Sequence, residues 1–166
     1  MKVEVFGRTN PYCSYCEGAK QLLNMRGIPF EWTDVNTVEP EVIDHLRTFG
    51  KTLPFIFIDG EYIGGFEQLS ADINMYVKRF AISEAAVSHS VEVTFQKSDG
   101  TTRVLHGTLN PTRMKDILSE AGLPLTDQGR EPKKKNLKVL PILDIESREW
   151  RSIPLDRVSA YGISTK

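Results

Sequence analysis

The residues best suited to do chemistry are Cys13 and Cys16, which are the only two cysteines and are separated by two residues. A pair of thiols at this spacing can carry out thiol–disulfide exchange, because one sulfur attacks a disulfide and the other resolves the mixed disulfide. The pair cannot supply four thiolates to a zinc ion, and the three histidines lie far from it without ligand spacing. The spacing alone would also fit half of a zinc site, so the surrounding sequence has to decide.

The elements that must position this pair are a strand and a helix. Residues 3–6 alternate as a short strand, a loop with Asn10 and Pro11 follows, and apolar residues recur at helical spacing over residues 15–25. Cys13 then precedes the helix, where unpaired backbone N–H groups and the positive end of the helix dipole favour a thiolate. We therefore predict that Cys13 is the nucleophile and that Cys16, one turn inside the helix, resolves.

The remaining pattern predicts two domains joined by a linker. In the first, residues 30–35, 53–58 and 62–63 read as strands and residues 40–49 and 67–80 as helices. Mixed in this order, strands and helices require a central sheet covered by helices. In the second, short predicted strands precede and follow one short helix along the sequence. This pattern predicts a small, mainly antiparallel β-barrel. The predicted domains are residues 1–80 and 90–166, with a small, polar linker at residues 81–89.

Composition excludes few functions but sets the background. The chain is 40% hydrophobic and has a formal net charge of -1, so no global field favours nucleic acid or a membrane. No apolar stretch near Met1 is long enough for a signal peptide or a membrane span, and we expect a cytoplasmic protein. In that reducing compartment, a cysteine pair is more typical of catalysis or metal binding than of a structural disulfide.

Four stretches resemble one known family: residues 6–8, 13–20, 52–60 and 63–67. Together they are similar to a dithiol glutaredoxin of the bacteriophage type, which has the thioredoxin fold, a mixed four-stranded sheet with three helices. The resemblance implies an enzyme that uses glutathione to reduce protein disulfides and glutathione mixed disulfides. Ribonucleotide reductase is the natural client, and the compartment would be the host cytoplasm if the chain is phage-encoded.

The resemblance also implies a glutathione site. Arg8 would meet the glycyl carboxylate, and Tyr15 would pack beside the tripeptide. Leu53 and a cis Pro54 would pair with its backbone, and the helix start near Gly65 would bind the γ-glutamyl carboxylate through N–H groups. The implied binding residues are Arg8, Tyr15, Thr52, Leu53, Pro54, Gly65, Phe66 and Glu67.

Two positions depart from the usual family pattern. The loop from Arg8 to Cys13 is longer than usual, as in bacteriophage glutaredoxins, and this bears on where Arg8 lies. Ser14 stands where the family usually has proline, and some family members with serine there bridge a [2Fe–2S] cluster between two subunits. A cluster-binding carrier is therefore an alternative to the oxidoreductase, which we expect to be a monomer without a metal.

Residues 88–163 resemble a phage-encoded WYL-like domain of unknown function with an SH3- or Sm-like barrel. The similarity lies in Phe95 and in residues 99–104, 107–111, 139–144 and 149–151. This family implies no activity, and we expect no second active site. The lysine run at residues 133–135 and Trp150 raise nucleic-acid binding as a hypothesis, but a solvated turn and a packing residue are the favoured interpretations. Recruitment of a protein or nucleic-acid partner by the barrel stays open as an alternative.

Overall fold

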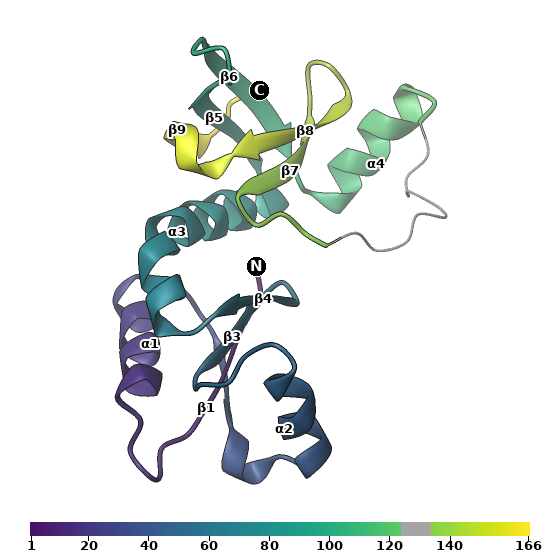
Figure 1. Cartoon of the computed structure of the whole chain (residues 1–166). Helices are drawn as coiled ribbons and strands as arrows, with labels where there is room; N and C mark the ends of the chain where they lie inside the picture. Colours follow the sequence, from purple (N-terminus) through teal and green to yellow (C-terminus); the bar gives the residue numbers. More distant parts are fainter. Residues whose placement is uncertain (124–133) are drawn as a thin grey trace. The chain divides into compact units, whose positions relative to one another are not determined.

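The computed structural model describes residues 1–123 and 134–166 and divides the chain into two compact units (Figure 1). The first unit is Met1–Val77 and the second is Lys78–Lys166. Within the described residues, none of the helices has the length and apolar character needed to cross a membrane. Each unit has its own sheet and its own core.

The first unit is built on a mixed four-stranded sheet with the strand order β2-β1-β3-β4. Strand β1 pairs in parallel with β2 and antiparallel with β3, and β3 pairs antiparallel with β4. Helices α1 and α2 flank the sheet with the first part of α3 (Figure 1). This confirms the predicted mixed sheet with three helices. The elements are β1 (Val3–Gly7), α1 (Ser14–Met25), β2 (Glu31–Asp34), the 3-10 helix η1 (Val35–Thr37), α2 (Pro40–Arg47), β3 (Phe55–Ile58), β4 (Glu61–Gly64) and α3 (Phe66–Ser88).

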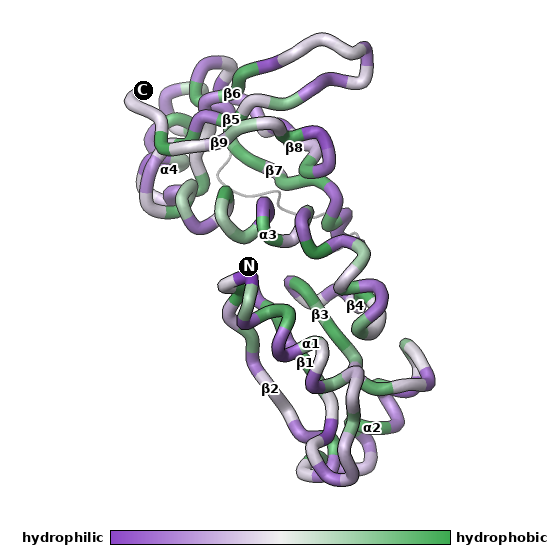
Figure 2. Tube along the Cα trace, turned by 90° about the vertical axis from the view of Figure 1, so that its left-hand side faces the viewer, coloured by the Kyte–Doolittle hydropathy of each residue, from purple (hydrophilic) through white to green (hydrophobic). Residues whose placement is uncertain are grey.

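Both faces of this sheet are covered, which explains its continuous apolar strand. Strand β3 is buried at all four positions and is a hydrophobic segment in Figure 2. One face contributes Phe55 and Phe57, which pack with Leu46 of α2. The opposite face contributes Ile56 and Ile58, both fully buried. A strand buried on both faces cannot alternate with polar residues.

The second unit is a five-stranded antiparallel sheet with the order β8-β7-β6-β5-β9, as expected for a small barrel domain of this kind. The sequence prediction missed β9. Five of its six residues are exposed and one of them is Gly162, so apolar and polar residues do not alternate clearly along it. The elements are β5 (Ser90–Gln96), β6 (Thr102–Thr108), α4 (Pro111–Glu120), β7 (Val139–Asp144), β8 (Glu149–Pro154), the 3-10 helix η2 (Leu155–Arg157) and β9 (Val158–Ile163).

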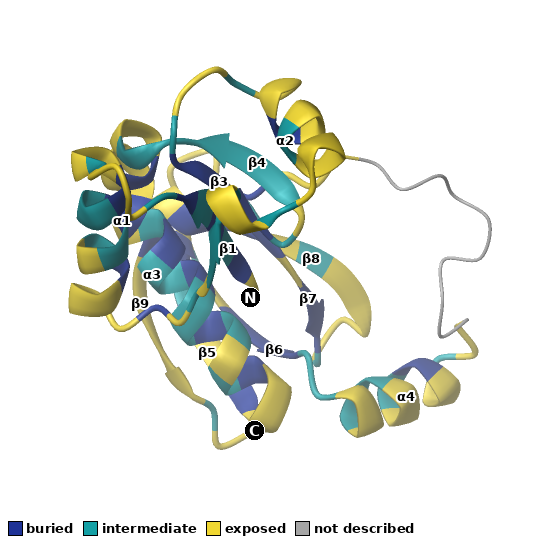
Figure 3. Cartoon of the chain, turned by 90° about the horizontal axis from the view of Figure 1, so that it is seen from below, coloured by how far each residue is buried: buried dark blue, intermediate teal, exposed yellow. Residues whose placement is uncertain are grey.

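The predicted end of the third helix at Phe80 is wrong, because α3 continues to Ser88 and leaves no irregular linker at residues 81–89. Figure 3 shows buried and exposed residues alternating around this helix. The buried positions recur every three or four residues, and Arg79 is one of them, 7% exposed. A charged residue at a buried position hides the apolar period from sequence reasoning. Its guanidinium Nη1 donates to the carbonyl oxygens of Val139, at 2.7 Å, and Leu137, at 3.4 Å. The buried residues are Leu69, Ile73, Tyr76, Arg79, Ile82 and Ala86.

Candidate active site

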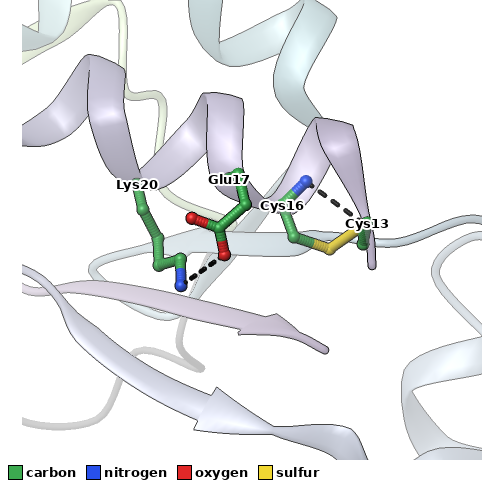
Figure 4. Close-up of a disulfide and its surroundings, with 4 residues drawn as sticks. All are labelled: Cys13, Cys16, Glu17 and Lys20. Carbon is green, nitrogen blue, oxygen red and sulfur yellow. Dashed lines mark hydrogen bonds and ion pairs between the residues drawn. A yellow bond between two sulfur atoms is a disulfide. The ribbon is translucent and has the colours of Figure 1, made fainter. Parts of the chain in front are cut away.

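The two cysteines lie at the start of α1, where a disulfide joins them (Figure 4). Cys13 is the N-cap residue with an extended backbone, φ -128° and ψ 103°. Its Sγ accepts a hydrogen bond from the backbone N–H of Cys16 at 3.2 Å. A sulfur in this position takes the place of the oxygen that usually caps a helix, and the same N–H group can stabilise a thiolate there after reduction.

Burial distinguishes the two sulfur-bearing residues. Cys16 is fully buried, at 0% exposed, whereas Cys13 is partly exposed. A second molecule can therefore approach Cys13 more easily than Cys16. This is the asymmetry expected if Cys13 attacks an external disulfide and Cys16 attacks only what Cys13 has captured.

Gly7 makes room for the buried sulfur, a role that sequence reasoning missed. A Cβ atom at Gly7 would lie 2.9 Å from the Cys16 Sγ and 2.5 Å from the ring of Trp32. The ammonium Nζ of Lys20 lies over the Trp32 ring, 4.2 Å from the ring centroid, in a cation–π contact. Lys20 forms an ion pair with Glu17 at 2.8 Å, also drawn in Figure 4. The end of β1 therefore lies directly against the Cys16 sulfur, and there is no room at residue 7 for a side chain.

A cleft of about 620 Å³ lies beside the start of α1 and collects most of the predicted binding residues. Its walls come from α1, from the loop before β3, from β4 and from the start of α3. Tyr15, two residues after Cys13, is one of the lining residues. The predicted residues that line this cleft are Tyr15, Thr52, Leu53, Gly65, Phe66 and Glu67.

The start of α3 forms part of the wall of this cleft. Gly65 donates its N–H to the Gln68 Oε1 at 2.9 Å, the side-chain half of a capping box. A Cβ at Gly65 would lie 3.4 Å from the Pro54 carbonyl oxygen, so the helix begins close to the Leu53–Pro54 peptide, which is cis as predicted. The first N–H groups of any α-helix have no acceptor within the helix and favour an anion.

Two predicted residues do not line the cleft. Pro54 is buried and adjoins it only through its backbone. Arg8 is absent from the lining, and its Nε is buried without a hydrogen-bond partner in the described part of the chain. The cleft instead has the exposed Lys51, whose position before Thr52 could have been noticed in the sequence. Tyr62 also lines it, and burial raises the pKa of this phenol.

The sequence also raises two other hypotheses, a bound metal cluster and nucleic-acid binding by the second unit. Over residues 1–123 and 134–166, no three His, Cys, Asp or Glu side chains are grouped to hold a metal ion. Lys133 and most of the predicted polar loop lie outside the described residues, while Lys134 and Lys135 are exposed. Trp150 is 51% exposed on β8.

Two family models and several known proteins match parts of this chain. The glutaredoxin family model matches residues 3–63, and the WYL_2 model, with an Sm-like SH3 beta-barrel fold, matches residues 84–159. Glutaredoxin 3 of Escherichia coli strain K12 is 34% identical over 70 residues, which cover 42% of this chain and 82% of that protein. Glutaredoxin of enterobacteria phage T4 is 38% identical over 69 residues, 34% of this chain and 79% of that protein.

Solved structures of glutaredoxins also align with part of the chain. Glutaredoxin 1 from Francisella tularensis, complexed with cacodylate, is 31% identical with a TM-score of 0.39, covering 46% of this chain and 95% of that one. The buckwheat glutaredoxin–glutathione complex is 26% identical with a TM-score of 0.37, covering 43% of this chain and 66% of that one.

Proposed function

Because the chain belongs to the glutaredoxin family of thiol–disulfide oxidoreductases, we propose that the domain of residues 1–80 uses glutathione to reduce protein disulfides and glutathione mixed disulfides. The observation that carries this proposal is the asymmetric pair, a partly exposed Cys13 capping α1 and a fully buried Cys16. We propose ribonucleotide reductase as one client, from family resemblance, and a monomer acting in the cytoplasm.

For a glutathione mixed disulfide, one sulfur is sufficient. The Cys13 thiolate attacks the glutathione sulfur, the substrate leaves as a thiolate that takes a proton from water, and glutathione remains bound to Cys13. A second glutathione thiolate then attacks the glutathione sulfur of this adduct, which gives oxidised glutathione and restores the Cys13 thiolate. Cys16 takes no part in this cycle.

For a protein disulfide, both sulfurs are needed. The Cys13 thiolate attacks one substrate sulfur, and the other substrate sulfur leaves and is protonated. The Cys16 thiolate then attacks the Cys13 sulfur, which releases the second substrate thiol and leaves the Cys13–Cys16 disulfide. Two glutathione molecules reduce that disulfide and leave as oxidised glutathione. The oxidised pair in the structure corresponds to the end of the first half of this cycle.

We propose the 620 Å³ cleft as the glutathione site. Glutathione carries two carboxylates, and the cleft offers two places for them: the ammonium of Lys51 and the N–H groups at the start of α3. Lys51 therefore suits the glycyl carboxylate better than Arg8, which does not line the cleft. The backbone of Leu53 is the proposed partner of the tripeptide backbone.

Single cysteine variants test the proposal. Cys13→Ser should lose both activities by at least about three orders of magnitude, because the one other thiol, that of Cys16, is fully buried and cannot start either cycle. Cys16→Ser should retain removal of glutathione from mixed disulfides and lose reduction of protein disulfides. Initial rates with a glutathionylated peptide and with insulin measure the two activities. Equal losses in both variants would contradict the division of roles.

A further inference from the structure

A second exposed aromatic side chain flanks the nucleophile and has no role in the proposed glutathione site. Tyr12, directly before Cys13, is 73% exposed, and it is absent from the lining of the cleft. Tyr15, on the other side of Cys13, is 54% exposed, lines the cleft and packs against Phe66 with ring centroids 6.3 Å apart. Within the described residues, no aromatic ring packs against Tyr12. Exposed aromatic rings are enriched where proteins bind one another.

The loop that carries Tyr12 is tied to the last residue of β2 and to η1, which follows it. The side-chain Nδ2 of Asn36 donates to the Asn10 carbonyl oxygen at 2.8 Å, and the Thr9 hydroxyl donates to the Asp34 Oδ2 at 3.2 Å. The same Asp34 carboxylate accepts the N–H of Asn36 at 2.9 Å, which joins the two contacts. A held loop loses less conformational entropy when a partner binds, so Tyr12 is presented in advance of binding.

The size of the substrate separates the two tyrosines. A tripeptide can be accommodated by the cleft that Tyr15 lines, and contact with Tyr12 is not needed for it. A protein bonded to Cys13 is larger than the cleft, and its chain must continue over the surface around the nucleophile. The most exposed aromatic side chain of the described residues stands there, next to Cys13.

Resting on the proposed function, we infer that Tyr12 determines specificity for protein substrates. Its ring contacts the polypeptide on Cys13 in the mixed disulfide, while glutathione binds without it. The favoured partner has an apolar or aromatic residue beside its reactive cysteine, because such a side chain gains most by covering an exposed ring. Tyr12 takes no part in the exchange of sulfur atoms.

The test compares Tyr12→Ala with wild type on two substrates, insulin and the mixed disulfide of glutathione with 2-mercaptoethanol. Tyr12→Ala should lower kcat/KM for insulin about five- to tenfold, as for the truncation of an interface aromatic, mainly through KM. The rate with the small mixed disulfide should stay unchanged. Tyr12→Phe should retain most of the insulin activity, because it keeps the ring.

Tyr161→Ala is the matched control, since Tyr161 is also an exposed tyrosine, at 44%, and lies on β9 in the second unit. It should change neither rate. Equal insulin rates for Tyr12→Ala and wild type would overturn the inference. So would equal losses on both substrates, which would make Tyr12 a positioning residue for Cys13. A wild-type protein that reduces neither substrate would instead refute the proposed function, so the two failures are distinguishable.

Discussion

The two units of this chain differ in how many polar side chains they bury. In residues 1–77, all of which the structure describes, the buried side chains are apolar or aromatic apart from the Cys16 thiol. In the second unit the described residues include five buried polar or charged side chains, each at most 8% exposed. These are Arg79, Ser90, His106, Thr108 and Asp144.

Most of these buried groups in the second unit are satisfied within the fold. Asp144 forms an ion pair with Arg103 at 2.9 Å and accepts the N–H groups of Glu146 and Ser147. The His106 Nδ1 lies 2.9 Å from the Ser164 Oγ. Groups that are paired in this way fix the arrangement of strands and are not available to a ligand. In the first unit, the chemically useful groups lie instead at helix starts beside a cleft. In this chain, buried polar groups that are paired with one another stabilise the fold, whereas the groups that we propose to bind and react lie at accessible helix starts.

The largest effect should come from breaking the buried ion pair of the second unit. Asp144→Ala leaves Arg103 and two backbone N–H groups without their acceptor. We expect a loss of about 2–4 kcal/mol in the free energy of unfolding, below the maximum for buried pairs because the Arg103 side chain can be partly hydrated. Thiol transfer by the first unit should be unchanged.

The two tryptophans make this loss measurable unit by unit, because Trp32 lies in the first unit and Trp150 in the second. Urea unfolding of Asp144→Ala is followed by fluorescence in two backgrounds, Trp32→Phe and Trp150→Phe. The midpoint reported by Trp150 should fall, and that reported by Trp32 should not. If both midpoints fall equally, the two units unfold together. The buried polar groups of the second unit would then not affect the stability of that unit alone.

A smaller effect is expected from filling the space beneath Cys16 in the first unit. Gly7→Ala places a Cβ 2.9 Å from the Cys16 Sγ and 2.5 Å from the Trp32 ring. Overpacking of this kind costs about 1–3 kcal/mol of stability. Because the displaced sulfur is the resolving one, reduction of insulin should fall more than removal of glutathione from a mixed disulfide.

Gly162→Ala is the control for Gly7→Ala, since a Cβ at Gly162 meets no atom within 4 Å. It should alter the free energy of unfolding by less than about 0.5 kcal/mol. Thermal unfolding and the two rate assays make the comparison. A Gly7→Ala protein with wild-type stability and rates would show that the floor beneath Cys16 adapts freely and does not hold the sulfur.

The parts that sequence reasoning predicted are those in which residue type alone determines the outcome. The apolar run of β3 and the position of Cys13 before α1 follow from local pattern. The length of α3 does not, because Arg79 is buried through carbonyl partners some 60 residues away. The cation of the cleft is of the same kind. The sequence resemblance indicates Arg8, and only the folded loops show that Lys51 lines the cleft instead.

The smallest effect should decide between these two cations. An exposed ion pair contributes about 0.5–1 kcal/mol, so Lys51→Gln should raise the KM for a glutathionylated peptide about two- to fivefold with little change in kcat. Arg8→Gln should leave KM within the error of the assay, and the Lys51 effect should shrink as salt is raised, because Lys51 is exposed to screening ions. The reverse pattern, a raised KM for Arg8→Gln alone, would return the glycyl carboxylate to Arg8. The site would then extend beyond the cleft toward the loop that carries Tyr12. In that case glutathione and protein substrates would share that loop, and the separation of the two tyrosines by substrate size would fail with it.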